Sequence, residues 1–213
     1  RTLSHYDALL RLHDDDGDVV PARVFITHAE NLGLMPQIDR WVVENVMRLL
    51  QTSPDLRVSL NLSASTVTNA GFRQFMQRQS RRMAAVGARI IFEVGEVAAV
   101  QNLPRMVEAM KRLRELGCRF ALDNFGITNA SLASLGVLPV DYVKLDGSLI
   151  RGIDVDQTRS ELARSLTTIA RALGREVIAG GAERAEIVAL LPELGVELAQ
   201  GHFLGLPSAE LRR

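Results

Sequence analysis

The chain has 213 residues, which is enough for one domain with a continuous core. Apolar residues make up 47% and charged residues 23%, a balance typical of a globular protein and unlike that of a disordered one. Twenty-five basic residues match 25 acidic ones, so no net charge attracts DNA, RNA or an anionic membrane. With no long apolar stretch, no signal-peptide pattern and a single cysteine, Cys118, we expect a cytoplasmic protein with a buried thiol.

Short β-rich runs alternate with longer amphipathic stretches along the whole chain, which predicts βα units and a mostly parallel sheet. The expected strands are Ala8–Leu12, Leu56–Leu60, Arg89–Phe92, Arg119–Leu122, Val140–Val143, Glu176–Ala179 and Val196–Ala199. The expected helices are Pro36–Leu50, with Ile38, Trp41, Val42 and Val46 at helical spacing, and Pro104–Leu116, Thr158–Leu173 and Ala185–Leu194.

No linker-like segment interrupts this alternation, so residues 1–213 are expected to form one domain. Seven predicted strands are one short of an eight-stranded (β/α) barrel, and a first strand upstream of this chain would complete it. An open doubly wound sheet is the alternative, but no G-x-G-x-x-G loop follows any predicted strand. The sequence therefore favours an α/β fold of the TIM-like (β/α)8 class.

Polar residues and a glycine follow the predicted strands one after another: Asn61, Glu93, Asp123 with Asn124, Lys144, Gly180 and Gln200. In a (β/α) barrel these positions meet at the carboxyl face, where such enzymes build active sites. For any one of them a strand end or a helix cap is the better explanation, but for the whole series it is not. As a set they are rich in the oxygen donors that Mg²⁺, Ca²⁺ or Mn²⁺ accept.

Histidine is absent from this set, which argues against a zinc site. The four histidines, His5, His13, His28 and His202, lack ligand spacing and are interpreted as surface or packing residues. Lys144 is a candidate to position or deprotonate a water, or else a partner in a salt bridge across the barrel mouth.

Eight motifs in order make the chain resemble the EAL domain family. They are YDALLR from Tyr6 (E-A-L-L-R), PARVFITHAENLGL from Pro21, Asn61-Leu62-Ser63, Phe92 to Glu96 (E-x-T-E), FALDNF from Phe120 (D-D-F-G), Val143 to Asp146 (K-x-D), Ala179 to Glu183 (A-E-G-V-E) and Gln200-Gly201-His202 (Q-G-Y). The resemblance implies a barrel that binds cyclic di-GMP at its mouth, and active members hydrolyse it to pGpG with two Mg²⁺ or Mn²⁺ ions. It also implies that the strand with the E-A-L motif is antiparallel to the others.

The resemblance further implies site residues. Asp7, Asn61, Glu93, Asp123 and Asn124 are expected at the metals, and Arg11, Asp146, Glu183, Gln200, Gly201 and Pro207 around the nucleotide. Ordinary structural roles are the alternative for the second set: Arg11 on the rim, Asp146 paired with Lys144, and Pro207 ending a loop.

Several departures from the family pattern lie at these same positions. Asp7 replaces the motif's Glu and withdraws its carboxylate by about 1.5 Å. Asn124 replaces an Asp and lacks its charge, and Gly180 replaces a Glu that ligates or relays a proton. Gly95 replaces a Thr of the family pattern, and the loop from Ile127 to Ser131 also differs from that pattern. Because two-metal catalysis needs both ions, we expect weak binding of Mg²⁺ or Mn²⁺ and little or no hydrolysis.

The sequence therefore favours a catalytically inactive receptor of cyclic di-GMP. A weak phosphodiesterase, with Lys144 catalytic, and an interaction module that binds neither nucleotide nor metal are the alternatives. EAL domains often follow a GGDEF or sensor domain, so we expect an attached domain of that kind or a protein partner; a homodimer is left open.

Overall fold

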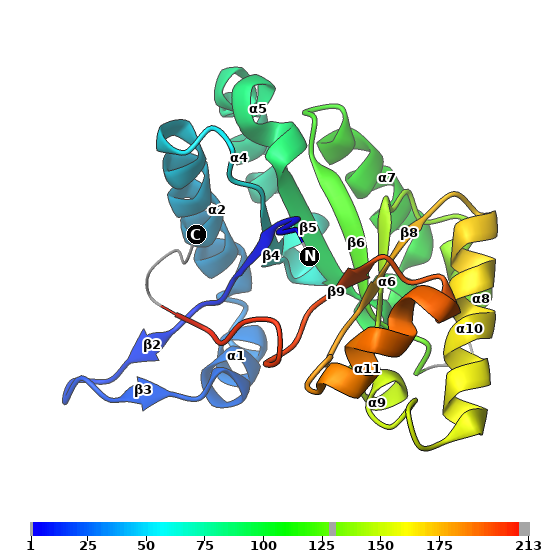
Figure 1. Ribbon diagram of the computed structural model, residues 1–213. Helices are drawn as coiled ribbons and strands as arrows, with labels where there is room; N and C mark the ends of the chain where they lie inside the picture. Colours follow the sequence, from blue (N-terminus) through cyan, green and yellow to red (C-terminus); the bar gives the residue numbers. More distant parts are fainter. Residues whose placement is uncertain (1, 128–130, 209–213) are drawn as a thin grey trace. The chain divides into compact units, whose positions relative to one another are not determined.

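The computed structural model describes residues 2–127 and 131–208, which divide into two compact units. Among the described residues, the first comprises 2–94 with 104–119, and the second comprises 95–103 with 120–127 and 131–208. Parallel strands joined by helices build both units, which confirms the predicted α/β class (Figure 1). No helix in the described part of the chain has both the length and the hydropathy needed to cross a bilayer.

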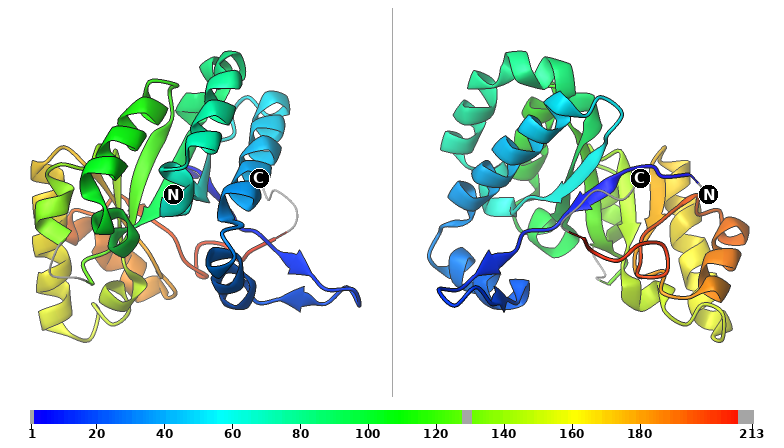
Figure 2. Two further views of the ribbon diagram at one scale, coloured as in Figure 1. Left: turned by 180° about the vertical axis from the view of Figure 1, so that it is seen from behind. Right: turned by 60° about the vertical axis from the view of Figure 1, so that its left-hand side comes forward.

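Three parallel strands in the order β1–β4–β5 form the sheet of the first unit. The strands are β1 (Tyr6–Ala8), β4 (Val58–Asn61) and β5 (Ile90–Gly95), with a separate ribbon of β2 (Leu12–His13) and β3 (Val19–Val20). The helices are α1 (Ala22–Asn31), α2 (Met35–Thr52), α3 (Ala64–Val67), α4 (Ala70–Arg78), α5 (Ser80–Val86), the short 3₁₀ helix η1 (Gly87–Arg89) and α7 (Leu103–Arg114). The β2–β3 ribbon lies beside α1 in every view of Figures 1 and 2.

The expected antiparallel strand at the E-A-L position is wrong. β1 pairs with β4 in parallel, and the Tyr6 N–H donates to the Arg57 carbonyl at 3.0 Å. The apolar run after Asp7 is not the strand either, because Leu9 and Leu12 are 45% and 44% exposed and the chain leaves the sheet after Ala8. Asp7 therefore lies inside the strand rather than before it.

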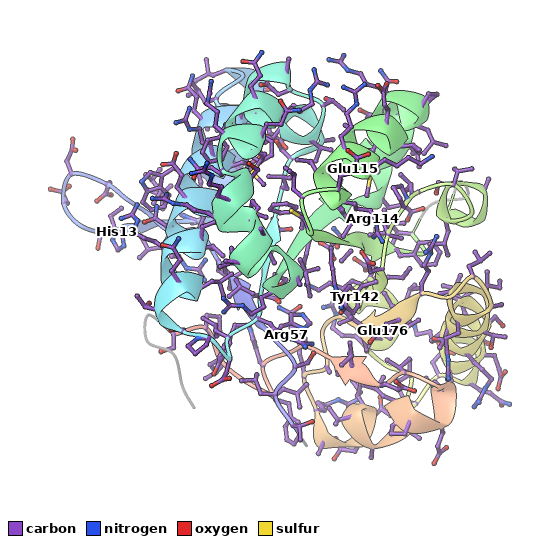
Figure 3. All side chains as sticks on the ribbon, turned by 90° about the horizontal axis from the view of Figure 1, so that it is seen from above. His13, Arg57, Arg114, Glu115, Tyr142 and Glu176 are labelled. Atoms are coloured by element: carbon purple, nitrogen blue, oxygen red, sulfur yellow. The ribbon has the colours of Figure 1, made fainter. Side chains whose placement is uncertain are left out.

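Four parallel strands in the order β6–β7–β8–β9 form the sheet of the second unit. They are β6 (Arg119–Phe125), β7 (Tyr142–Leu145), β8 (Glu176–Ala179) and β9 (Leu198–Ala199). The helices are α6 (Glu96–Gln101), α8 (Ser131–Leu135), α9 (Gly147–Ile150), α10 (Gln157–Ala172), α11 (Ala185–Leu190) and the 3₁₀ helix η2 (Leu191–Leu194). Tyr142 and Glu176, both labelled in Figure 3, are register partners at the start of β7 and β8.

Helix α2 (Met35–Thr52) buries a different face from the one that its sequence predicted. The structure buries a set at positions 35, 39, 43, 46, 47 and 50, which has the spacing of one helical face. Trp41 is 59% exposed, although its spacing predicted a core residue. Asp39 takes a core-facing position instead, with consequences for the turn after β4.

Candidate functional site

The carboxyl ends of β4 and β5 bring Asn61 and Glu93 together, as the sequence predicted. The two residues are register partners, so their side chains share one face of the sheet. Glu93 is buried, with 2% of its surface exposed, whereas Asn61 is exposed. Leu62 donates its N–H to the Glu93 carbonyl at 2.8 Å, which continues the ladder past the end of β4. A carboxylate and an amide oxygen at one strand edge suit a hard divalent cation.

Asp7 lies on the same face, one pleat earlier. It pairs with Ser59, which is two residues before Asn61 and therefore points to the same side. The Ser59 hydroxyl donates a short hydrogen bond to Asp7 Oδ1. Asp7 thus fits a cation site through its chemistry, but a hydroxyl already holds one of its oxygens.

His5 is a residue of this cluster that the sequence analysis missed. Its Nε2 lies 3.8 Å from Asp7 Oδ1, and one ligand atom from each of His5, Asp7 and Glu93 falls within 4.8 Å of the others. Among the residues that the structure describes, no other group of three His, Cys, Asp or Glu meets this criterion. The signal was the H-x-D spacing, which puts both side chains on one face of an extended chain. The structure therefore places a histidine beside the oxygen donors, which the expected histidine-free donor set did not include.

Asp39 is a second residue that sequence reasoning overlooked. The side chain is buried in α2, and a carboxylate oxygen accepts the Ser63 N–H at 3.0 Å. Burial raises the pKa of Asp39, and hydrogen bonds from Thr66 and Ser63 oppose that shift. Ser63 in turn caps α3 by accepting the Thr66 N–H. Asp39 thereby fixes the turn that begins at Asn61.

Arg11 is exposed in the segment between β1 and β2. Its Nη1 donates to the Leu10 carbonyl at 3.0 Å, which holds the guanidinium against its own backbone. Its expected role at a phosphate stays a prediction.

In the second unit, Asp123 and Asn124 lie near the end of β6. Asn124 has a φ of 55°, the left-handed conformation that asparagine tolerates better than most residues. Its Nδ2 donates to Asp123 Oδ2 at 3.1 Å. An aspartate at position 124 would repel Asp123 instead, so this substitution changes the local electrostatics as well as the ligand type.

A buried carboxylate supports the backbone that follows this pair. Glu96, at the start of α6, is fully buried, and its Oε2 accepts the Gly126 N–H at 3.2 Å. The altered loop that begins at Ile127 is described only in part: Ile127 is 52% exposed, and residues 128–130 lie outside the described residues.

Lys144 lies within strand β7, whereas Asp146 lies after the strand, at the start of helix α9. Lys144 is half-buried on β7 and pairs in register with Ile178. Asp146 caps α9 by accepting the Ser148 N–H at 2.7 Å. A helix cap explains Asp146 without a nucleotide, as the structural alternative allowed, and its nucleotide role stays a prediction.

Close backbone packing explains two glycines at the strand ends. Gly180 donates its N–H to the Leu145 carbonyl, and an added Cβ would lie 2.8 Å from that oxygen. At Gly201 an added Cβ would lie 2.2 Å from the Ala182 carbonyl oxygen. Both positions therefore require glycine in this backbone. By contrast, a Cβ at Gly95 meets nothing within 4 Å.

The remaining predicted nucleotide residues are Gln200, Glu183 and Pro207. Gln200 is half-buried, and its backbone bonds to Ala179 and Ala182 at 2.8 Å. Glu183 is exposed, with Oε1 3.8 Å from Arg151 Nη1, and Pro207 is exposed in the C-terminal segment. These contacts leave their nucleotide roles as predictions.

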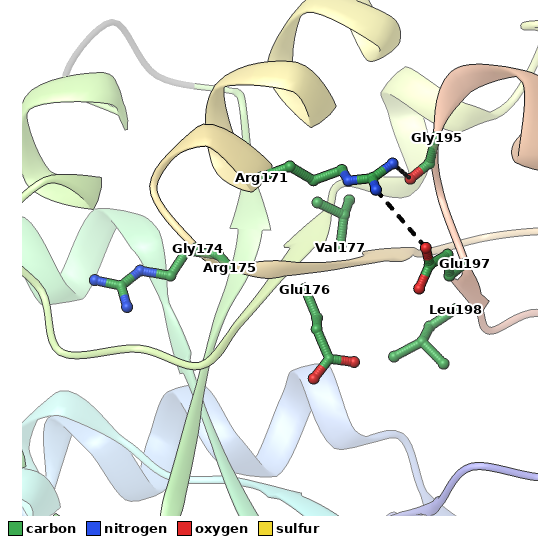
Figure 4. A pocket seen from close by; sticks show the side chains of 8 residues that line it. All are labelled: Arg171, Gly174, Arg175, Glu176, Val177, Gly195, Glu197 and Leu198. Atoms are coloured by element: carbon green, nitrogen blue, oxygen red, sulfur yellow. Dashed lines mark hydrogen bonds and ion pairs between the residues drawn. The ribbon is translucent and has the colours of Figure 1, made fainter.

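The second unit also contains a pocket. It surrounds the start of β8, where Arg171 donates to the Gly195 carbonyl at 3.1 Å and lies 3.8 Å from Glu197 (Figure 4). None of the predicted site residues lines it. The pocket is at the amino ends of the strands, opposite the edge where parallel α/β sheets bind ligands.

Comparison with known proteins places the chain in one family. The model of the EAL domain matches residues 1–207. The cyclic di-GMP phosphodiesterase PdeB of Shewanella oneidensis is 33% identical over 205 residues, which are 94% of this chain and 24% of PdeB. An uncharacterized protein of Mycobacterium tuberculosis is 35% identical over 209 residues, or 92% of this chain and 68% of that protein. The chain spans about a quarter of the first curated relatives it matches, 24% of PdeB and 28% of PdeF from Escherichia coli.

Solved structures match over nearly the whole chain. The FimX EAL domain from Pseudomonas aeruginosa bound to c-di-GMP has a TM-score of 0.88 at 26% identity, covering 98% of this chain and 86% of that one. The PaMucR phosphodiesterase in complex with c-di-GMP has a TM-score of 0.85 at 27% identity, covering 94% and 83%. These matches confirm the predicted class of fold.

Proposed function

Since the chain belongs to the EAL domain family, we propose that it acts in cyclic di-GMP signalling as a receptor with little or no hydrolytic activity. Relatives named as cyclic di-GMP phosphodiesterases, and an EAL domain solved with c-di-GMP bound, support the nucleotide as ligand. The low activity is argued from this chain's own residues.

The absence of a carboxylate at Gly180 is the observation that best supports the proposed low activity. The resemblance assigns this position to a glutamate that ligates a metal or relays a proton. Here the backbone approaches the Leu145 carbonyl so closely that a Cβ would lie 2.8 Å from the oxygen. The missing carboxylate is therefore built into the path of the chain, because even the first atom of a side chain lacks space.

Two further changes weaken cation binding in the same direction. The carboxylate of Asp7 is one methylene shorter than that of glutamate and accepts a hydrogen bond from Ser59. The Asn124 amide donates to Asp123 and contributes no charge of its own. Mg²⁺ demands near-ideal octahedral oxygen geometry, so it tolerates such changes poorly.

The donor set of the first unit still fits a divalent cation. Asn61, Glu93 and Asp7 lie on one face of the β1–β4–β5 sheet and offer amide and carboxylate oxygens. We assign these residues to cation binding, and in the second unit Asp123 and Asn124 keep the metal role that the resemblance implies. When bound, the cation would polarise a phosphodiester oxygen and its water.

The nucleotide itself is assigned to Arg11, Asp146, Glu183, Gln200, Gly201 and Pro207, with Lys144 as the water-orienting group in any residual hydrolysis. An arginine guanidinium pairs well with phosphate, and Arg11 is exposed and therefore accessible. The whole protein is proposed to join this domain to a GGDEF or sensor domain, or to relay nucleotide occupancy to a protein partner.

Calorimetric titration with cyclic di-GMP in the presence of Ca²⁺ tests the receptor. We expect saturable binding that Arg11→Ala weakens by about tenfold or more, since a charge-assisted bond to phosphate is lost. Arg48→Ala, which changes an exposed arginine on α2, is the matched control and should leave binding unchanged. Absence of saturable heat would favour the interaction module, and conversion to pGpG with Mg²⁺ or Mn²⁺ would favour the phosphodiesterase.

A further inference from the structure

A histidine nitrogen lies among the carboxylates of the first unit. His5 and Asp7 are two residues apart in extended chain, so their side chains project from the same side. The parallel register of β1 with β4 and of β4 with β5 puts Asn61 and Glu93 on this side as well. All these groups belong to one compact unit, and their proximity follows from strand pairing alone.

The burial of the cluster distinguishes it from acidic groups on an open surface. The side chains of His5 and Asp7 are 10% and 15% exposed, and Glu93 is 2% exposed. Moving two carboxylates out of water is costly unless a positive charge compensates them. A bound cation would add positive charge directly beside these carboxylates.

Hydrogen bonds orient both His5 and Asp7. The Nδ1 of His5 lies 3.2 Å from the Ser4 hydroxyl, and its other nitrogen, Nε2, is the one near Asp7. The Ser59 hydroxyl holds Asp7 Oδ1 from the neighbouring strand. Metal-binding histidines and carboxylates are commonly fixed in this way by partners outside the ligand set.

The spacing of the donor atoms is close to that of a coordination sphere. Ligands 2.0–2.2 Å from one ion are about 3 to 3.5 Å apart. The three donor atoms here lie within 4.8 Å of one another, and the His5–Asp7 pair is at 3.8 Å. Side-chain adjustments of about an ångström would therefore close the group on an ion.

We propose that His5 is a metal ligand, and that this chain binds a divalent transition ion such as Zn²⁺ or Mn²⁺ through His5, Asp7 and Glu93 in preference to Mg²⁺. Imidazole favours Zn²⁺ and other transition ions, whereas Mg²⁺ takes oxygen ligands almost alone. His5 compensates for the shortened Asp7 by adding a donor from the residue just before β1. The proposal concerns metal binding only and holds whether or not the nucleotide binds.

Titration of the metal-free protein with ZnCl₂, MnCl₂ and MgCl₂ gives the first test. We expect His5→Ala to weaken Zn²⁺ binding by about tenfold to a hundredfold, with Mg²⁺ affinity changed less than about twofold. His28→Ala removes an exposed histidine of α1 and should change neither affinity. Equal Zn²⁺ affinity in wild type and His5→Ala, or no saturable Zn²⁺ or Mn²⁺ binding by wild type, would overturn the proposal.

Pulsed electron paramagnetic resonance of the Mn²⁺-loaded wild-type chain gives a test that needs no variant. Imidazole ligation predicts ¹⁴N modulation from a directly bound nitrogen, and its absence contradicts the proposal. If His5→Ala does not fold, His5→Asn keeps a polar side chain next to Ser4 without an imidazole and should also lose the ¹⁴N signal. Retention of that signal in His5→Asn would assign the nitrogen to another residue.

Discussion

Ser63 donates its backbone N–H to Asp39 at 3.0 Å, and this hydrogen bond joins α2 to the turn at the end of β4. The carboxylate is buried at a core-facing position of the helix, where an apolar residue would be expected. Its position makes Asp39 a determinant of where Asn61 lies, although it is remote from Asn61 in sequence.

Asp39→Asn is predicted to remove a pH dependence of stability. Burial raises the pKa of Asp39 above its ordinary value of 3.8, so the native state binds the proton more tightly than the unfolded state. The contribution to stability is complete below pH 3.8 and is lost as pH rises through the folded-state pKa. Urea titrations from pH 4 to 7 should therefore show wild type losing stability relative to Asp39→Asn, which keeps an acceptor for Ser63.

Asp39→Ala is the control for that experiment. It removes the acceptor and leaves the Ser63 N–H unmet, so we expect a loss of about 1–3 kcal/mol in the free energy of unfolding. If the free energy of unfolding of wild type increased relative to that of Asp39→Asn as pH rises, the raised pKa of Asp39 would be contradicted.

Gly180→Ala is expected to destabilise the chain by about 1–3 kcal/mol, because the new Cβ forces a backbone shift beside the Leu145 carbonyl. Gly95→Ala is the matched control, since a Cβ there meets nothing within 4 Å. Chemical denaturation of both variants measures the difference. Equal stability of Gly180→Ala and Gly95→Ala would show that the strand end adapts without cost.

The same clash changes what a reversion can achieve. Asp7→Glu and Asn124→Asp add no new Cβ to the backbone, but Gly180→Glu inherits the Gly180→Ala clash. We expect the triple variant to be less stable than the double variant Asp7→Glu/Asn124→Asp and to regain little hydrolysis. A triple variant that has the melting temperature of wild type and also produces pGpG would contradict this expectation.

Cys118 is predicted to be unreactive in the native protein. It is 3% exposed, and burial raises the pKa of the thiol to about 12, so almost no thiolate exists at pH 8. Ellman's reagent should label native protein very slowly and label one thiol per chain in urea, because Cys118 is the only cysteine. Rapid labelling of the native chain would mean that the segment between α7 and β6, which contains Cys118, opens frequently.

The sequence predicted the parallel strands well because alternating apolar runs and strand-end polar residues are local signals. Glu176–Ala179 was predicted at its observed bounds, and the residues after the β4 and β5 runs, Asn61 and Glu93, share a sheet edge as expected. The buried thiol of Cys118 was also predicted and is confirmed.

The wrong predictions concern features that depend on which strands pair and on which face a helix buries. The direction of β1 depends on its partner strand, which its own sequence does not specify. The rotation of α2 left Trp41 exposed and buried Asp39, since two overlapping apolar patterns fit one helix. The β2–β3 ribbon was missed although Asp14 to Asp18, with Gly17 at a φ of 88°, is a typical turn. His5 was interpreted as a surface or packing residue, because its proximity to Asp7 and Glu93 depends on strand pairing as well as on spacing.

A ³¹P NMR titration of cyclic di-GMP with the wild-type chain in Mg²⁺ tests the central claim most directly, because one spectrum reports both binding and hydrolysis. The account predicts that the phosphodiester resonance shifts and saturates at one ligand per chain, while no phosphate monoester resonance of pGpG appears over several hours. A growing monoester resonance, or a phosphodiester resonance that the protein leaves unchanged, would contradict it.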